Sequence, residues 1–160
     1  MKRIQVGGHR KNSKIKLYAF VDSEDFEKVS KYRWIIQKNG WGQIYAYSHK
    51  EKTLMHRLIM ECPEMIDHAN GNGLDNRKSN LRICDKRLNM ANSKKRSDAK
   101  TSTYKGVSKH TDHHREKPWV VRVSRKRIGT YKTEEEAARA YNKAARSAFG
   151  QYAKLNTIST

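Results

Sequence analysis

The sequence is poor in cysteine, in acidic residues and in long apolar runs. Its two cysteines, Cys62 and Cys84, are too few and too far apart for a zinc site of the paired-cysteine kind, and we assign them no function. A reduced thiol pair is typical of an intracellular protein. No apolar run approaches the roughly 20 residues of a membrane-spanning helix, and residues 1–5 lack the apolar segment of a signal peptide. We therefore expect a cytoplasmic protein without a membrane partner.

The scarcity of acid leaves a large excess of positive charge. Asp and Glu together number 16, against 35 for Lys and Arg, and the formal net charge is +19. This charge favours a polyanionic partner, and nucleic acid fits best. Apolar residues make up 36% of the 160-residue chain and charged residues 32%. That balance disfavours one large core and predicts small modules joined by polar connections.

Residues 1–53 predict a small mixed α/β unit. Apolar residues alternate over 15–21, which is strand periodicity, and an acidic start to a short helix follows. The dipeptide Asn39-Gly40 separates two β-favouring runs and tolerates the positive φ of a tight turn. We therefore expect a hairpin at this point.

The most informative segment is residues 66–83. Strand-like apolar residues surround a loop rich in Gly, Asn and Asp, and a helix capped by Asp85 is expected next. Such a unit can bring Asp67 and His68 beside Asn89 of the helix. A carboxylate and an amide oxygen are hard ligands suited to Mg²⁺ or Mn²⁺. A neutral histidine can take a proton from water during phosphodiester hydrolysis. A hydrogen-bonded turn without catalytic function is the alternative.

Residues 54–95 resemble the HNH motif of phage and intron-encoded homing endonucleases. The resemblance rests on the Asp-His pair at 67–68, the Asp-Asn-Arg and Asn-Leu-Arg runs within 75–82, and Asn89 followed by Asn92. It implies a ββα-metal catalytic core that cuts DNA. An Asn replaces the final His of the motif, which argues against zinc because zinc prefers nitrogen or sulfur ligands.

The resemblance also implies a function for individual residues. Asp67 and Asn89 would hold one divalent ion, Mg²⁺ or Mn²⁺, and His68 would be the general base. Asn80 would form hydrogen bonds across the fold and hold the loop that supports His68. His56 would touch the phosphate or brace the site. A neighbouring Asn, three residues after Asn89, is the weaker ligand candidate.

Residues 104–160 resemble the ethylene-response-factor (Apetala) type of DNA-binding domain. The resemblance is carried by five runs, 104–107, 119–123, 128–131, 135–141 and 153–156. The first three runs favour strands, and Thr133 with the glutamates after it predicts a capping box at the start of a helix that runs to about Phe149. The resemblance implies a three-stranded sheet that lies in the major groove.

Basic residues are assigned to DNA contact by residue type. Arginine can bond guanine bidentately, whereas lysine mainly neutralises phosphate. Base reading is expected from Arg122, Arg125 and Arg127, and backbone contact from Lys105, Lys109 and Lys126. Further expected DNA contacts are Arg77, Lys94, Lys95, Arg96 and Trp119. For each cation, a solvated surface charge is the alternative.

The sequence thus predicts an α+β protein: a mixed unit at 1–53, a ββα-metal core at 54–95, a basic linker at 96–103, and a three-stranded antiparallel sheet packed on one helix at 104–160. The expected function is site-specific, homing-type cleavage of double-stranded DNA with one divalent ion and no small-molecule substrate. Nicking or double-strand cleavage, and monomer or dimer, are left open. The alternative is a non-catalytic DNA-binding regulator that uses the HNH fold as a scaffold. RNA binding is disfavoured because no stacking-aromatic signature of the RNA modules is present.

Overall fold

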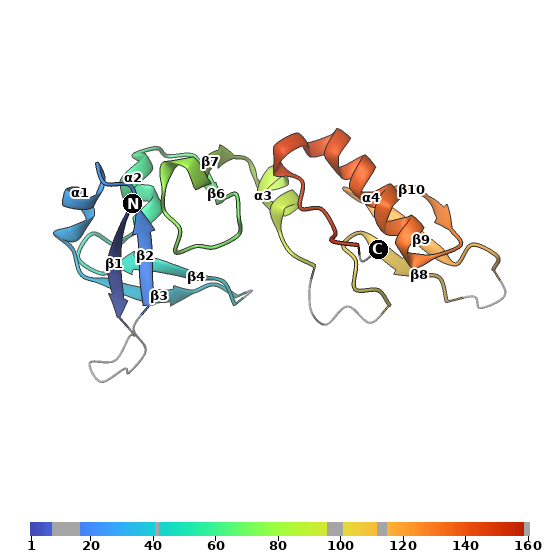
Figure 1. Ribbon diagram of the computed structural model, residues 1–160, viewed down its shortest axis with the longest axis horizontal. Coiled ribbons are helices and arrows are strands. Elements are labelled where there is room, and N and C mark those ends of the chain that lie inside the picture. Colours follow the sequence, from blue (N-terminus) through green and yellow to red (C-terminus); the bar gives the residue numbers. More distant parts are fainter. Residues whose placement is uncertain (8–16, 41, 96–100, 112–114, 159–160) are drawn as a thin grey trace. The chain divides into compact units, whose positions relative to one another are not determined.

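The computed structural model describes residues 1–7, 17–40, 42–95, 101–111 and 115–158. The chain forms two compact units, Met1–Lys86 and Arg87–Thr160, and each has its own apolar core (Figure 1). The α+β fold class predicted from the sequence is confirmed. None of the helices in the described ranges has the length and apolar character that a bilayer crossing requires.

The first unit is built on a mixed five-stranded sheet in the order β2-β1-β3-β4-β5. Its strands are β1 (Lys2–Gly7), β2 (Leu17–Val21), β3 (Trp34–Lys38), β4 (Ile44–Ser48) and β5 (Thr53–Leu54). β1 pairs antiparallel with β2 and parallel with β3. The strand predicted at 15–21 is present from Leu17, and Ile15 lies outside the described residues. β1 was not predicted from the sequence, because Ile4 and Val6 are its only buried apolar residues and polar residues surround them.

The predicted hairpin at Asn39-Gly40 is confirmed. β3 and β4 pair antiparallel on either side of it, and the amide of Asn39 donates to the carbonyl of Gln43 at 3.0 Å. The side-chain oxygen of Asn39 also accepts from the amide of Gln43, at 3.0 Å. The turn therefore fixes the register of β4, the strand that carries Tyr45.

Two helices and a short ribbon complete the first unit. The helices are α1 (Phe26–Ser30) and α2 (Met55–Met60), and the ribbon consists of β6 (Met65–His68) and β7 (Leu81–Cys84), with the 3₁₀ turn η1 (Lys78–Asn80) between them. The short helix expected after β2 is α1. The ribbon and the sheet share one core, because Ile66, Leu74 and Leu81 are buried with Trp34 and Met55.

The loop between β6 and β7 is attached to the edge of the sheet. Phe20 of β2 donates its amide to the carbonyl of Leu74 and accepts from the amide of Asn76, both at 2.8 Å. Gly73 lies so close to β4 that a side chain there would overlap the Ile44 carbonyl and the Tyr45 ring. The fold therefore holds this loop between β2 and β4.

The second unit is an antiparallel sheet in the order β10-β9-β8 that packs on one long helix. Its elements are α3 (Lys86–Asn92), β8 (Val107–Lys109), β9 (Trp119–Val123), β10 (Lys126–Tyr131), α4 (Glu134–Phe149) and η2 (Gly150–Tyr152). The end of α4 at Phe149 and the capping box between Thr133 and Glu136 are confirmed. α3 follows Asp85, as expected.

The predicted position of the first strand of this sheet, 104–107, is wrong. β8 begins only at Val107, whose amide donates to the carbonyl of Tyr104 at 3.3 Å, so that 104–107 is a turn. Gly106 has a φ of +72°, and a side chain there would overlap the ring of Tyr141. The close approach of the helix, together with the left-handed backbone, excludes a strand at this position.

Candidate functional site

His68 lies at the end of β6, with its side chain inside the first unit. It is 5% exposed. Its ring centroid lies 5.0 Å from that of His56 of α2 and 5.8 Å from that of Tyr45 of β4. The side-chain oxygen of Asn76 is 3.4 Å from Nε2 of His68. The ribbon, the sheet, α2 and the loop thus each contribute one side chain to this cluster.

Burial determines the charge state of this cluster. It lowers the pKa of His68 below its usual value, although the hydrogen bond to Asn76 and the nearby Asp67 carboxylate act in the opposite direction. Burial also lowers the pKa of His56 to about 3, and His68 contributes to that shift. Burial and Asp67 raise the pKa of Tyr45. Both histidines are therefore neutral near pH 7, and a neutral imidazole can accept a proton.

Asn80 holds the two ends of the loop together. Its side-chain oxygen accepts from the amide of Asn70 at 3.0 Å, and its side-chain nitrogen donates to the carbonyl of Asp75 at 2.8 Å. Its backbone carbonyl accepts from the amide of Ala69, next to His68, at 2.8 Å. The cross-loop bonds expected for Asn80 are thus present in the structure, while its importance for catalysis stays a prediction.

Asp75 and Arg77 form a second support for the loop. The guanidinium of Arg77 contacts both carboxylate oxygens of Asp75, each at 2.7 Å. Asn70 donates its side-chain amide to Asp75 at 2.8 Å. Arg77 was expected to contact DNA. With its side chain 38% exposed, it can do so only while it also neutralises Asp75.

Asp67 precedes His68 and is held by Arg82, its partner across the ribbon. Nε and one terminal nitrogen of Arg82 donate to the same oxygen of Asp67, at 2.9 and 2.6 Å. The side chain of Asp67 is 7% exposed and that of Arg82 is 14% exposed. A buried, ion-paired carboxylate is a group whose counter-charge a metal ion can replace.

The donors of the first unit fit a hard divalent ion that keeps part of its water shell. Mg²⁺ is commonly bound by one or two carboxylates, with water and phosphate oxygens in its other positions. Asp67 supplies one such carboxylate, although no group of three or more acidic, His or Cys side chains suited to a metal occurs in the described ranges. Asn89 and Asn92 lie on α3, and Asn89 belongs to the second unit. Metal binding by Asp67 together with Asn89 therefore stays a prediction.

In the second unit, the exposed face of the sheet carries Arg122 and Arg127. They lie directly opposite each other on β9 and β10, and both are exposed. Like charges in this position repel. Ser124 and Arg125 form the hairpin turn with φ values of 49° and 68°, where Gly or Asn is usual. A bound polyanion would relieve the repulsion between Arg122 and Arg127.

Other predicted DNA contacts have partners within the second unit. Nζ of Lys105 donates to the carbonyls of Met90, Ala91 and Ser93, at 3.1, 2.6 and 2.6 Å. Burial lowers the pKa of Lys105 to about 8, with a contribution from Lys154. Lys105 thus caps the end of α3.

The remaining cations divide into bonded and exposed side chains. Lys95 donates to the carbonyls of Tyr104 and Val107, at 2.7 and 2.9 Å, and burial lowers its pKa. Trp119 packs against the core, with Nζ of Lys109 5.6 Å from its ring. Lys94, Lys109 and Lys126 are exposed, whereas Arg96 and linker residues 96–100 lie outside the described residues. DNA contact by each of these residues stays a prediction.

Sequence reasoning missed Tyr45, Asn76 and Arg82 as members of the site. Asn76 and Arg82 stood inside the recognised runs, and antiparallel pairing of the two predicted strands would have placed Arg82 opposite Asp67. Tyr45 carried no such signal, because it reaches His68 only through the packing of the ribbon on the sheet.

Comparison with known proteins identifies the family. A protein of Acanthamoeba polyphaga mimivirus, named as an uncharacterized HNH endonuclease, is 32% identical over 149 residues, which cover 88% of this chain and 75% of the mimivirus protein. No protein-family profile and no solved structure matches the chain. The ethylene-response-factor type of domain therefore stays a prediction, whereas the chain belongs to the HNH endonuclease family.

Proposed function

We propose that this protein is a metal-dependent, site-specific DNA endonuclease of the homing type. The observation that carries the proposal is the buried pair at the end of β6, where Asp67 is ion-paired and His68 is kept neutral and bonded to Asn76. HNH endonucleases generally use a divalent metal ion. The charge of +19 supplies the electrostatic attraction to duplex DNA.

His68 is the general base in this proposal. The side-chain oxygen of Asn76 lies 3.4 Å from Nε2, and in the tautomer that carries the proton on Nε2 the ring accepts on Nδ1. Nδ1 takes a proton from the attacking water, the new bond forms between the water oxygen and phosphorus, and the bond to the 3′ oxygen breaks. Asn80 keeps the loop, and with it Asn76, in place for this step.

Asp67 is the proposed metal ligand of the first unit, and Asn89 is the proposed ligand from α3. Mg²⁺ or Mn²⁺, when bound, supplies positive charge near the phosphate and the departing oxygen. Arg82 donates to Asp67 in the structure, and in this proposal its guanidinium also contacts a phosphate oxygen. His56 and Tyr45 form the wall against which the His68 ring rests.

The second unit is the proposed DNA-reading module. Arg122 and Arg127 are offered to bases from the face of the sheet that α4 leaves uncovered, and Arg125 from the turn between their strands. Lys109 and Lys126 are exposed and are offered to the backbone, although their strand partners Trp119 and Val123 pack on the α4 side of the sheet. The strained Ser124-Arg125 turn supports this proposal, since it presents an arginine at the tip of the hairpin.

The test is cleavage of supercoiled plasmid with Mg²⁺, with Mn²⁺ and with EDTA, by the wild type and by Asp67→Asn. We expect nicked or linear product only with metal, and a loss of cleavage in the variant with DNA binding retained. Binding of wild-type protein without cleavage under all metal conditions would instead establish a non-catalytic DNA-binding regulator.

A further inference from the structure

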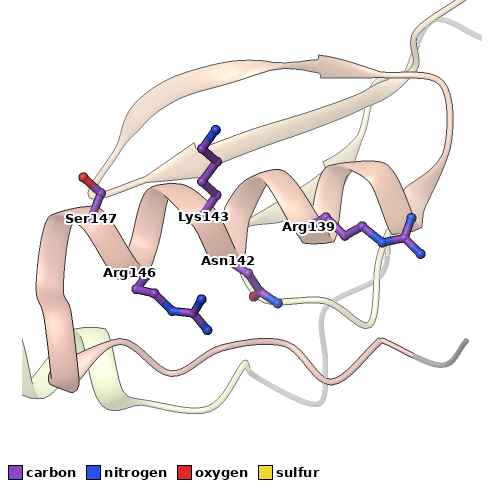
Figure 2. Close-up of a pocket in the computed structure, with 5 residues that line it drawn as sticks. All are labelled: Arg139, Asn142, Lys143, Arg146 and Ser147. Atoms are coloured by element: carbon purple, nitrogen blue, oxygen red, sulfur yellow. The ribbon is translucent and has the colours of Figure 1, made fainter.

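The outer side of α4 carries cations that the proposed chemistry does not use. The inner side of the helix is buried against the sheet through Ala137, Ala138, Tyr141 and Ala145. The outer side forms a pocket, here named the α4 face, that is lined by Arg139, Asn142, Lys143, Arg146 and Ser147 (Figure 2). None of the lining residues is acidic.

The cations of the α4 face make no ion pair in the described part of the chain. Arg139, Lys143 and Arg146 are exposed, and none of them takes part in an ion pair there. Their spacings of four and three residues place like charges next to each other on a helix, which is unfavourable. The helix dipole favours Arg146 in the last turn, and Glu135, four residues before Arg139, favours that arginine, but neither accounts for Lys143.

The pocket is held in shape by the C-terminal segment. The side-chain nitrogen of Asn142 donates to the carbonyl of Asn156 at 2.9 Å, and the amide of Asn156 donates to the side-chain oxygen of Asn142 at 2.7 Å. The side chain of Asn156 is bonded in turn to the backbone of Lys105, at 2.7 and 3.1 Å. Figure 2 shows Arg139 and Arg146 on either side of Asn142, projecting toward this segment.

The two groups of exposed cations in the second unit lie on opposite sides of it. Arg122 and Arg127 lie on the face of the sheet turned away from α4, and the α4 face lies beyond the helix. A sheet and a helix, each about 10 Å thick, separate them. One straight duplex cannot cover both surfaces.

We propose that the α4 face binds the phosphate backbone of a second DNA segment, so that the protein bridges two duplexes. Arg139 and Arg146 are separated by about 10 Å along the helix axis, which spans about three phosphates of one strand. Lys143 lies between them along the helix, with its side chain on the other side of the ribbon in Figure 2. Contacts of these cations with phosphates carry no sequence information. The inference relies on one part of the proposed function, namely that the sheet of the second unit holds the first duplex.

Energy transfer between two duplexes tests the proposal. Full-length protein is mixed in EDTA with one donor-labelled and one acceptor-labelled duplex, so that bridging gives a signal and cleavage does not occur. The variant carries Arg139→Gln, Lys143→Gln and Arg146→Gln. The matched control carries Lys31→Gln, Arg33→Gln and Lys38→Gln, which removes the same charge from exposed positions of the first unit.

We expect the bridging signal of the variant to be at least about tenfold lower than that of the wild type. Its affinity for a single duplex should change by less than about threefold. The control keeps the wild-type signal, and circular dichroism shows that both proteins are folded. Equal bridging by variant and control overturns the inference, and so does a variant that loses single-duplex binding altogether.

A parallel assay with Mg²⁺ separates this inference from the proposed function. Wild-type protein that cuts a single duplex but does not bridge two duplexes refutes the second DNA surface alone. Wild-type protein that bridges but never cuts leaves the α4 face supported and refutes the nuclease. If the α4 variant still cuts DNA but no longer bridges two duplexes, both the nuclease and the second DNA surface are supported.

Discussion

The two units place their polar groups in opposite ways. The first unit buries them, and His56, Asp67, His68 and Asn80 are each less than 10% exposed. The second unit presents cations such as Arg122 to water. Buried groups keep fixed geometry and shifted pKa values, which a chemical step requires. Exposed cations exchange small counter-ions for phosphates, which binding requires. This difference predicts that mutations can separate cleavage of DNA from binding of DNA.

The largest expected effect concerns the base. We expect His68→Ala to lower the rate of cleavage at saturating DNA by about 10²–10⁴-fold, because the proton of the attacking water then has no positioned acceptor. DNA affinity should be unchanged within error. Single-turnover cleavage and an equilibrium binding assay measure the two quantities separately.

The matched variants for this prediction are His68→Gln and His49→Ala. Glutamine preserves much of the packing but cannot act as a base, so it should be as inactive as alanine. His49 is exposed, and its loss should leave cleavage intact. Cleavage by either His68 variant at the wild-type rate would remove His68 from the mechanism.

The next effect concerns the ion pair between Arg82 and Asp67. We expect Arg82→Gln to lower the free energy of unfolding by about 3 kcal/mol, because it leaves the carboxylate of Asp67 buried without its cation. Lys28→Gln breaks a surface pair with Glu61 and should cost less than about 1 kcal/mol. Urea unfolding measures both.

Mg²⁺ or Mn²⁺ should restore part of the stability of Arg82→Gln, since a metal on Asp67 replaces the lost charge. The wild type should gain less, because there the ion competes with Arg82. An equal metal response of both proteins would show that the ion does not bind at Asp67.

The DNA contacts of the sheet are tested by the salt dependence of DNA affinity. Replacing Arg122 and Arg127 by glutamine should reduce the slope of log affinity against log salt by about 2. The rate of cleavage at saturating DNA should stay the same. A charge-matched variant with Lys31→Gln and Arg33→Gln should keep most of the slope, and an equal reduction would mean that the sheet is not the main DNA surface.

The last prediction, whose effect is small within any one pH unit, concerns the pH dependence of stability that comes from His56. Its folded pKa of about 3 lies below the usual 6.5, so the unfolded chain binds the proton more tightly. The contribution is therefore complete above pH 6.5 and is lost as the pH falls toward 3, by up to about 1.4 kcal/mol per pH unit. His56→Gln should flatten this part of the urea-unfolding profile, and an unchanged slope would contradict the burial of a neutral imidazole.

Local signals were sufficient for much of the fold. The Asn39-Gly40 turn and the capping box at Thr133 depend on residues within a few positions of each other, and both were predicted from the sequence. The positions of two strands depend on non-local contacts. β1 has few apolar residues and is held by its neighbours β2 and β3, and the position of β8 depends on the ring of Tyr141 above Gly106.

The same distinction holds for the candidate site. Asp67, His68 and Asn80 stand in one motif and could be identified together. The ring of Tyr45 and the contact between His56 and His68 arise from tertiary packing. For Lys105, residue type suggested a phosphate contact, and the structure shows in addition that its ammonium caps α3. A cation's function depends on its exposure, which the sequence alone does not give.

The central claim is that the buried cluster cuts DNA and the cationic sheet holds it. The most direct measurement is cleavage rate and affinity on one labelled duplex with Mg²⁺, for the wild type, for His68→Ala, and for Arg122→Gln with Arg127→Gln. The account predicts that the first variant loses rate and keeps affinity, and that the second loses affinity and keeps the rate at saturation. Loss of both quantities together in both variants would contradict it.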